Sequence, residues 1–373
     1  MALKPGADLV SGRIGAAMGV DYEALLDLLR RDMAGAEPQY QPTHYWRQCA
    51  RRLETDLARE GLERFRASPG PLTHFVPTYT FGALAGDRAR LESITAGLHD
   101  ALPLQDKLHR ALDQFLDGQG QAEADYRVYR ASCQERRPFV GAISESTVGA
   151  PVGQFEFSGR RYSRSMLNYL LGLNFAKTHI EDLCVNTVLE IGGGFGSLGE
   201  VLLGDDRNGT FYVDVDIPPT AVYATYYLGQ VLGSSRVIDY ARVREQEELD
   251  LGSLRRDGDA AVLPPWLLPR LTGHVDLFVN FISFQEMEPD VVQGYLGHVA
   301  RLQARHVLLR NLAEGKEIAH TEEQLGVREP IRSEDYDRFL PDYDLVATNV
   351  FPFGYRTVDG YHSELRLYRR RSA

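Results

Sequence analysis

The sequence predicts an α/β protein, with an open, mostly parallel sheet in its C-terminal half and a mainly helical N-terminal half. Residues 187–203 read as a buried strand, a glycine-rich turn and a helix, and short apolar runs then alternate with helical patterns. In the N-terminal half apolar residues recur at helical spacing, and β-branched runs are rare before residue 180. We therefore expect two domains, at residues 1–180 and 181–373.

The N-terminal half contains helical stretches separated by turn signals. A Pro-Gly-Pro cluster follows Ser68, and Pro103 interrupts a longer helical pattern. Residues 137–165 mix Gly, Ser, Pro and aromatic residues, which indicates an irregular segment with a short hairpin around Gly159. The expected helices span residues 21–33, 43–62, 87–116, 122–136 and 165–179.

The glycine-rich turn directly follows the strand that ends at Ile191. Glycine has no Cβ, so it permits positive φ and lets ligand atoms approach the backbone closely. The helical pattern that begins near Ser197 would present free backbone N–H groups at the same place. The turn therefore predicts a nucleotide-binding site, formed by Gly192, Gly193, Gly194 and Gly196.

Two nucleotide-binding motifs compete for this turn. Residues 194–199 match the dinucleotide pattern G-x-G-x-x-G, but that pattern begins two residues after the natural end of the strand. If the pattern is counted from Gly192, the position of its third glycine is occupied by Ser197, so the match fails. The pattern acidic-x-G-x-G-x-G fits without a gap, through Glu190, Gly192, Gly194 and Gly196.

Two aspartates lie on the second expected strand, residues 210–217. Asp214 and Asp216 are two residues apart and therefore share a face of the strand. Asp216 stands where the strand ends, about 20 residues after the glycine turn, the spacing at which an acidic side chain meets ribose hydroxyls. Its two oxygens can accept from both hydroxyls of a ribose. Alternatively, Asp216 caps the next helix.

Polar residues also follow the fourth of the expected strands. The strands after residue 217 span residues 236–240, 274–280, 306–312, 344–351 and 363–370. Open α/β sheets bind ligands outside the carboxyl ends of their strands, so residues just past the fourth strand are candidates for a site. These are Asn280, Ser283, Gln285, Glu286 and Glu288.

Several of these segments resemble a known enzyme family. The acidic-x-G-x-G-x-G pattern resembles the first motif of class I S-adenosylmethionine-dependent methyltransferases. Five β/α units with two closing strands resemble the Rossmann-like seven-stranded methyltransferase sheet of that class, whose last strand is antiparallel. EIGGGFG, VDVDIPPTAVYATYYL, LPPW and DLFVNFISFQEM are similar to sugar O-methyltransferases of bacterial natural-product and polysaccharide gene clusters. The similarity covers chiefly residues 187–312.

The resemblance implies S-adenosylmethionine as the cofactor and assigns residues to it. The glycine turn would face the amino-acid part of the cofactor, and Glu190 would organise its ammonium end. Asp216 would bind the ribose, and Asp214, on the same face of the strand, is a further candidate for cofactor binding. Asp239, at the end of the third strand, would meet adenine, although a turn residue explains it as well. Asn280 would bind cofactor or substrate, or satisfy the backbone of a loop.

The implied reaction is O-methylation of a sugar hydroxyl, on a glycosylated natural product or a sugar precursor. Such a hydroxyl holds its proton far above neutral pH, so a general base is expected. The candidates are Glu286, His362, and His44 beside Tyr45 and Trp46. Glu286 alternatively caps or ion-pairs the following helix, and any single histidine of the ten is more often structural. A divalent metal is an alternative to a base, but no ligand pattern indicates one.

Charge and cysteine content limit the partners and the location. The chain has 373 residues and a net charge of −11, which disfavours non-specific binding to nucleic acid or to an anionic membrane. Its three cysteines form no metal or redox pattern and indicate a reducing compartment. No apolar run is long enough to cross a bilayer, and the first 20 residues lack the apolar core of a signal peptide. We therefore expect a cytoplasmic protein.

The expected partner is a small-molecule acceptor. The N-terminal half would recognise it, cover it as a lid, or form the contacts of a homodimer. Arg160, Arg161 and Arg164 either hold a phosphate or carboxylate of the acceptor or are exposed loop charges.

Three other functions stay open: methylation of a non-sugar molecule, an NAD-dependent oxidoreductase that uses residues 194–199, and a non-catalytic partner subunit. An oxidoreductase should bind NAD(H), and Gly199→Ala should impair it more than Gly192→Ala.

Overall fold

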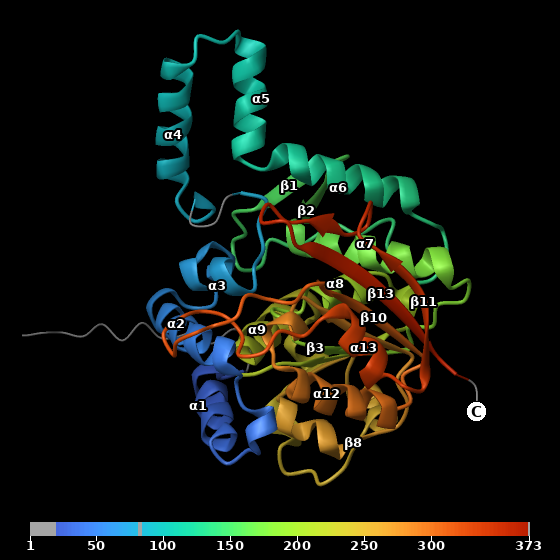
Figure 1. Cartoon of the computed structure of the whole chain (residues 1–373). Coiled ribbons are helices and arrows are strands. Elements are labelled where there is room, and N and C mark those ends of the chain that lie inside the picture. Colours follow the sequence, from blue (N-terminus) through green and yellow to red (C-terminus); the bar gives the residue numbers. More distant parts are fainter. Residues whose placement is uncertain (1–19, 81–83, 372–373) are drawn as a thin grey trace, which may run out of the picture.

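A mixed sheet of nine strands forms the centre of the computed structural model, which describes residues 20–80 and 84–371 (Figure 1). The expectation about a signal peptide falls on residues 1–19 and lies outside the described residues. From edge to edge the strands are β11 (Tyr343–Asn349), β13 (His362–Arg370), β10 (His306–Leu312), β9 (Leu277–Phe281), β3 (Thr187–Ile191), β4 (Phe211–Val215), β7 (Ala260–Leu263) and β5 (Val237–Ile238). The ninth, β12 (Tyr355–Arg356), pairs with β13.

The fully buried strand β3 lies in the middle of the sheet. It pairs in parallel with β4 on one side and with β9 on the other, so the order of the strands reverses at β3. The strands from β5 to β10 run parallel, whereas β13 is antiparallel to both β10 and β11. A reversal of strand order opens a crevice at the carboxyl ends of the strands, where such sheets bind ligands.

The described sheet is larger than the seven strands that we expected. The additions are β7 and the two-residue strand β12, whereas the two-residue strand β5 is all that forms of the strand expected at residues 236–240. The strand that pairs with β4 is β7, and the sequence predicted no strand at these residues. Its four residues, AAVL, are too few for periodicity to separate strand from helix or loop, and alanine has little strand preference.

Helices cover both faces of the sheet. An ideal Cβ on Gly172 of α7 (Arg164–His179) would lie 3.6 Å from Cδ2 of Leu365, whereas Arg366 donates to Asp337 of α13 (Ser333–Phe339). Successive side chains of a strand point to opposite faces, so α7 and α13 cover opposite sides of β13. α8 (Ser197–Leu203) and α9 (Thr220–Leu232) continue the layer of α7, and α12 (Pro289–Arg301) packs on α13.

Short elements connect the strands on the β5 side of the sheet. α10 (Tyr240–Val243) follows β5, and α11 (Leu251–Asp257) leads into β7. β6 (Leu249–Asp250) and β8 (Leu271–Thr272) form a separate parallel pair.

The N-terminal half is built from helices and one hairpin. The helices are α1 (Tyr22–Met33), α2 (His44–Glu60), α3 (Pro69–His74), α4 (Arg88–Ala101), α5 (Asp106–Leu116) and α6 (Gln119–Ser132). The break between α4 and α5 contains Pro103, as expected, and both helices project from the body (Figure 1). The expected hairpin is confirmed: β1 (Gln154–Phe157) and β2 (Arg160–Ser163) pair around Gly159, whose φ is +73°.

The hydrophobic core runs without interruption from the N-terminal helices into the sheet. Leu25 and Leu29 of α1 belong to the same buried cluster as Val188 and Leu189 of β3. α1 packs on α9 and α10, and α7 packs on α8 and β10. α1 and α7 are therefore fixed against the sheet and the helices that cover it. Among the described residues, no helix combines the length and the apolar character that crossing a bilayer requires.

Candidate functional site

A cavity of about 1100 Å³, its open mouth included, lies at the carboxyl ends of β3, β4 and β9. Its volume suits one or two small molecules. The sheet contributes residues 191–194, 215–217 and 281–283, and the N-terminal half contributes residues 41–43 and 72–75. The structure thus places the cavity at the point where the strand order reverses, with a second wall made by α2 and α3.

The glycine turn forms part of the cavity wall in a conformation that favours glycine. Gly192 and Gly194 have φ of +74° and +67°. An ideal Cβ on Gly192 would lie 2.0 Å from Oγ of Ser283, so a larger residue has no room there. Gly196, with φ of +86°, directly precedes α8 and does not line the cavity.

Two aspartate side chains accept hydrogen bonds from backbone N–H groups of this turn. The amide of Gly193 donates to Oδ1 of Asp214 at 3.2 Å, and the amide of Gly194 donates to Oδ2 of Asp216 at 3.0 Å. Oδ1 of Asp216 accepts from the amide of Ile217 at 2.7 Å. Asp216 lines the cavity, whereas Asp214 lies behind the turn. A phosphate that approached the turn would therefore meet carboxylates in place of free N–H groups.

Glu190 lies behind the turn as well. Its Oε1 accepts from the hydroxyl of Tyr169 at 2.8 Å, and its Oε2 accepts from the hydroxyl of Tyr212. An ideal Cβ on Gly193 would lie 2.8 Å from Oε2 of Glu190, which places this carboxylate against the back of the turn. Tyr169 lines the cavity and Glu190 does not, so Glu190 affects the cavity through its hydrogen bond with Tyr169.

The three carboxyl groups behind and beside the turn form an acidic cluster without a basic partner. Burial raises the pKa of Glu190 to about 7, although hydrogen bonds from both tyrosines lower it, and burial raises the pKa of Asp216 to about 7. Burial and the neighbouring carboxyl groups hold the pKa of Asp214 well above its usual range. Within the described residues none of the three has an ion-pair partner. Such a cluster favours a ligand that brings positive charge.

Asn280 holds the carboxyl ends of two strands together. Its Nδ2 donates to the carbonyl of Ile191 at 2.8 Å and to Oγ of Ser283 at 3.0 Å, and its Oδ1 accepts from Asn311 at 3.0 Å. The side chain is buried and does not line the cavity. Asn280 therefore positions the glycine turn and the loop after β9.

The loop after β9 contains a strained residue and an ion pair. Ile282 lines the cavity with φ of +72°, a conformation that is an outlier for a β-branched residue. Glu286 also lines the cavity, and its carboxylate pairs with the ammonium of Lys316, while its backbone carbonyl accepts from Thr43 at 3.0 Å. Glu286 thus ties this loop to the start of α2.

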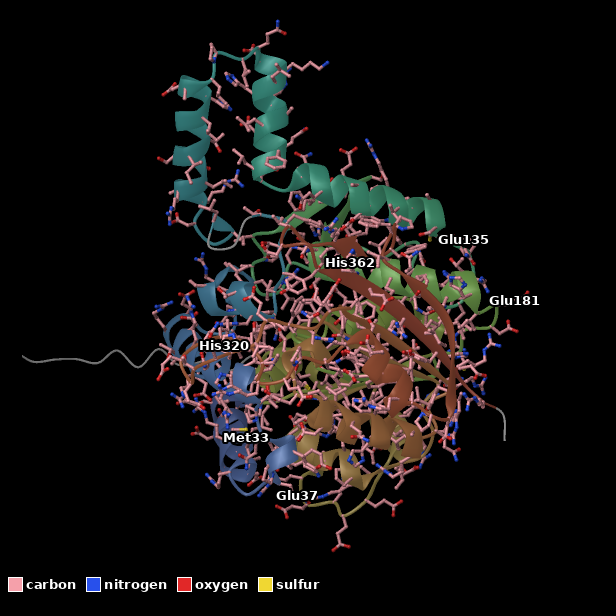
Figure 2. All side chains as sticks on the ribbon, viewed as in Figure 1. Met33, Glu37, Glu135, Glu181, His320 and His362 are labelled. Carbon is pink, nitrogen blue, oxygen red and sulfur yellow. The ribbon has the colours of Figure 1, made fainter. Side chains whose placement is uncertain are left out.

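Three residues that the sequence placed in the site lie outside the cavity. Asp239 caps α10, where its Oδ1 accepts from the amide of Arg242 at 3.1 Å. His44 is buried, and its Nε2 is 3.2 Å from the carbonyl oxygen of Gln324. His362 lies at the start of β13 (Figure 2). Its side chain pairs with Glu314. None of the three appears in the cavity wall.

The three arginines considered for an acceptor phosphate are engaged elsewhere. Arg160 and Arg161 donate to the carbonyls of Gly141 and Glu145, and Arg164 donates to the carbonyl of Thr78 at 2.8 Å. They do not line the cavity. The described residues contain no group of three or more His, Cys, Asp or Glu side chains arranged to hold a metal ion.

Sequence reasoning did not select His74 or Asn168, and both line the cavity. His74 ends α3, and both of its ring nitrogens are buried without a hydrogen-bond partner. Asn168 lies on α7, is 4% exposed, and has an unpartnered Oδ1. His74 follows a Pro-Gly-Pro cluster that indicates only a turn, and Asn168 lies inside an amphipathic helical pattern. Neither pattern carries a signal for a binding role.

Gly199 is required for packing. An ideal Cβ on Gly199 would lie 2.8 Å from the ring of Tyr212 and 2.9 Å from Leu228. Gly199→Ala therefore disturbs the contact of α8 with the sheet whichever nucleotide binds. The substitution does not discriminate between a dinucleotide and another cofactor.

Comparison with known proteins yields distant structural likenesses. No protein-family model and no curated protein matches the chain. The mitomycin 7-O-methyltransferase MmcR is 13% identical, with 88% of this chain and 69% of MmcR covered and a TM-score of 0.34. The magnesium protoporphyrin IX methyltransferase of Synechocystis PCC 6803, with bound SAH, is 13% identical, with 70% and 99% covered and a TM-score of 0.36. The 1,6-didemethyltoxoflavin-N1-methyltransferase of Burkholderia thailandensis is 15% identical, with 55% and 79% covered and a TM-score of 0.35.

Proposed function

We propose that the protein is an S-adenosylmethionine-dependent methyltransferase that acts on a hydroxyl group of an uncharged small molecule. One observation carries the proposal: the backbone N–H groups of the glycine turn already donate hydrogen bonds to aspartate side chains. Gly193 donates to Asp214, and Gly194 donates to Asp216. A dinucleotide needs such groups for its pyrophosphate, whereas a sulfonium cofactor brings positive charge to a cluster of carboxylates. The sequence resemblance to class I methyltransferases points the same way.

The residues of the cavity suit the parts of this cofactor. Asp216 would accept from the ribose hydroxyls, since each carboxylate oxygen keeps a free lone pair. The turn at Gly192–Gly194 would face the amino-acid end, with Glu190 behind it. Ile217 and Pro265, which line the cavity after β4 and β7, offer apolar surface to adenine. The bound cofactor supplies the methyl group that is transferred.

The protein itself would position the two reactants and exclude water from the cavity. The glycine turn, Asp216 and the loop after β9 hold one side of the cavity, and α2 and α3 cover the other. Two reactants held at contact distance react as an intramolecular pair, which is the main advantage a methyl transfer needs.

The wall of the cavity supports an uncharged acceptor. Trp46, Phe75 and Phe281 provide aromatic surface, and no lysine or arginine appears in the wall that the described residues form. A nucleotide-sugar carries phosphates, and this wall offers no cationic side chain to bind them. Aromatic faces suit the apolar faces of sugars, so a sugar hydroxyl of a glycosylated natural product or sugar precursor is the proposed target. Methylation of a non-sugar hydroxyl is the alternative.

Calorimetric titration with S-adenosylhomocysteine, with NADH as the control, tests the cofactor. Micromolar binding of S-adenosylhomocysteine that Asp216→Asn weakens supports the proposal. Binding of NADH alone would establish the oxidoreductase, and binding of neither would favour a non-catalytic partner subunit. A cytoplasmic location, a homodimer and a division at residue 180 remain predictions of the sequence.

A further inference from the structure

We propose that His74 is the catalytic residue that takes the proton from the acceptor hydroxyl, an inference that rests on the proposed methyl transfer. The acceptor oxygen forms a bond to the methyl carbon as the carbon–sulfur bond breaks. The electron pair of the broken bond stays on sulfur, and the hydroxyl proton passes to a ring nitrogen of His74. Water removes that proton after the product leaves.

His74 lies in the cavity wall next to the segment that covers the glycine turn. It is the last residue of α3 and lines the cavity. The next residue, Phe75, lies over the glycine turn, because an ideal Cβ on Gly194 would be 3.7 Å from both Cβ and the carbonyl oxygen of Phe75. His74 is thus one residue from the segment that covers the turn where the amino-acid end of the cofactor would lie.

The imidazole of His74 is free to accept a proton. Both ring nitrogens are buried and lack a partner, which is costly in a folded protein unless a ligand supplies one. Burial and, to a smaller extent, the charges of Arg52 and Lys316 together lower its pKa to about 4, although Asp56 opposes them. Trp46 packs 6.4 Å away, between ring centroids. At neutral pH the ring is therefore uncharged and one nitrogen carries a lone pair.

The other bases of the cavity are engaged. Asp216 accepts from two backbone amides, and the carboxylate of Glu286 is paired with Lys316. Among the imidazole and carboxyl groups that line the cavity in the described residues, His74 alone has no hydrogen bond within the protein. His44 and His362 lie outside the cavity wall. The proton acceptor that the sequence placed at Glu286, His44 or His362 is therefore better placed at His74.

The first test needs no acceptor. Imidazole nitrogen shifts of the protein loaded with S-adenosylhomocysteine are recorded by NMR from pH 5.5 to pH 8, and His74 is assigned by its loss in His74→Gln. A neutral His74 across this range supports the proposal. A His74 that is cationic at pH 7 overturns it, because a protonated ring cannot accept a proton.

The second test measures transfer of labelled methyl from S-adenosylmethionine to a panel of uncharged phenyl β-glycosides. His74→Gln should bind S-adenosylhomocysteine like the wild type but lower kcat by roughly 10²- to 10⁴-fold with little change in KM. Its residual rate should rise with pH where the wild-type rate is flat, and imidazole should partly rescue His74→Ala. The control is His274→Gln, at an exposed histidine outside the cavity wall, which should leave the rate unchanged.

Retention of kcat within threefold in His74→Gln, with cofactor binding intact, overturns the role of His74 alone. A lower kcat with an unaltered pH profile and no imidazole rescue makes His74 a positioning residue and also overturns it. Failure of the wild type to bind S-adenosylhomocysteine overturns the methyltransferase proposal and this one with it. If no glycoside of the panel is methylated, the protonation state seen by NMR decides.

Discussion

The amide of Gly194 donates to Oδ2 of Asp216 at 3.0 Å, across the gap between the ends of β3 and β4. One carboxylate therefore holds the glycine turn and also faces the cavity. The turn and the aspartate act as a unit, and a ligand that binds one meets the other. Four predictions test this unit and its surroundings.

Asp216→Asn should weaken the binding of S-adenosylhomocysteine by about 10- to 100-fold, because a hydrogen bond to a charged acceptor is worth roughly 1.5–3 kcal/mol. The amide keeps the size of the side chain, so the fold should persist. Calorimetry measures the affinity, and Asp206→Asn, at an exposed position after α8, serves as the control. Equal affinity in the Asp216 variant and the wild type would place the ribose elsewhere.

The same binding should depend on pH. The pKa of Asp216 is about 7, and ribose hydroxyls donate to the charged carboxylate, so below that pKa binding must release a proton. The affinity should therefore fall about tenfold per pH unit as pH drops below 7, and level off above pH 8. Calorimetry between pH 5.5 and 8.5 measures this slope. Asp216→Asn should flatten it, and a flat wild-type profile contradicts the prediction.

Glu190→Gln should alter how the stability of the ligand-free protein depends on pH. The folded-state pKa of Glu190, about 7, lies above its ordinary value of 4.5, so the carboxyl group stabilises the fold at low pH and loses that contribution as pH rises through 7. Glutamine stays neutral, so the Tm of the variant relative to the wild type should be higher at pH 8 than at pH 5.5.

Tyr212→Phe is the matched change for this measurement. It removes a hydroxyl that favours the charged form of Glu190, so the pKa of Glu190 should rise further and the loss of Tm should be larger and extend to higher pH. Parallel melting curves for all three proteins would show that Glu190 does not titrate in this range.

Gly192→Ala should damage both fold and site. The new Cβ meets Oγ of Ser283 at 2.0 Å, and φ is +74°. Backbone strain of this kind costs about 1–3 kcal/mol. Gly297→Ala, in the exposed middle of α12 with no atom within 4 Å of its Cβ, should instead raise stability by about 0.5–1 kcal/mol. Urea unfolding measures both, and equal effects would refute the geometry of the turn.

The sequence was sufficient to predict that the glycine turn and Asp216 lie together, because these signals are local. Glycines that follow a buried strand, and Asp216 at the end of the next one, belong to a single strand–turn–helix unit, and the structure places them as neighbours. β7 escaped prediction because four apolar residues carry too little periodicity. His74 escaped because only tertiary packing brings α3 over Gly194. The roles of Glu190 and Asn280 behind the turn likewise depend on the partners Tyr212 and Asn311 from other strands.

The antiparallel insertion of β13 between β10 and β11 has a consequence for the order of folding. β13 follows both neighbours in the chain, so β11 has no sheet partner, and β10 keeps an open edge, until β13 has emerged from the ribosome. Open strand edges pair readily with other chains. At the late stage of synthesis, when residues up to 361 are available but His362–Arg370 are not, these open edges make the protein prone to aggregate and to need a chaperone.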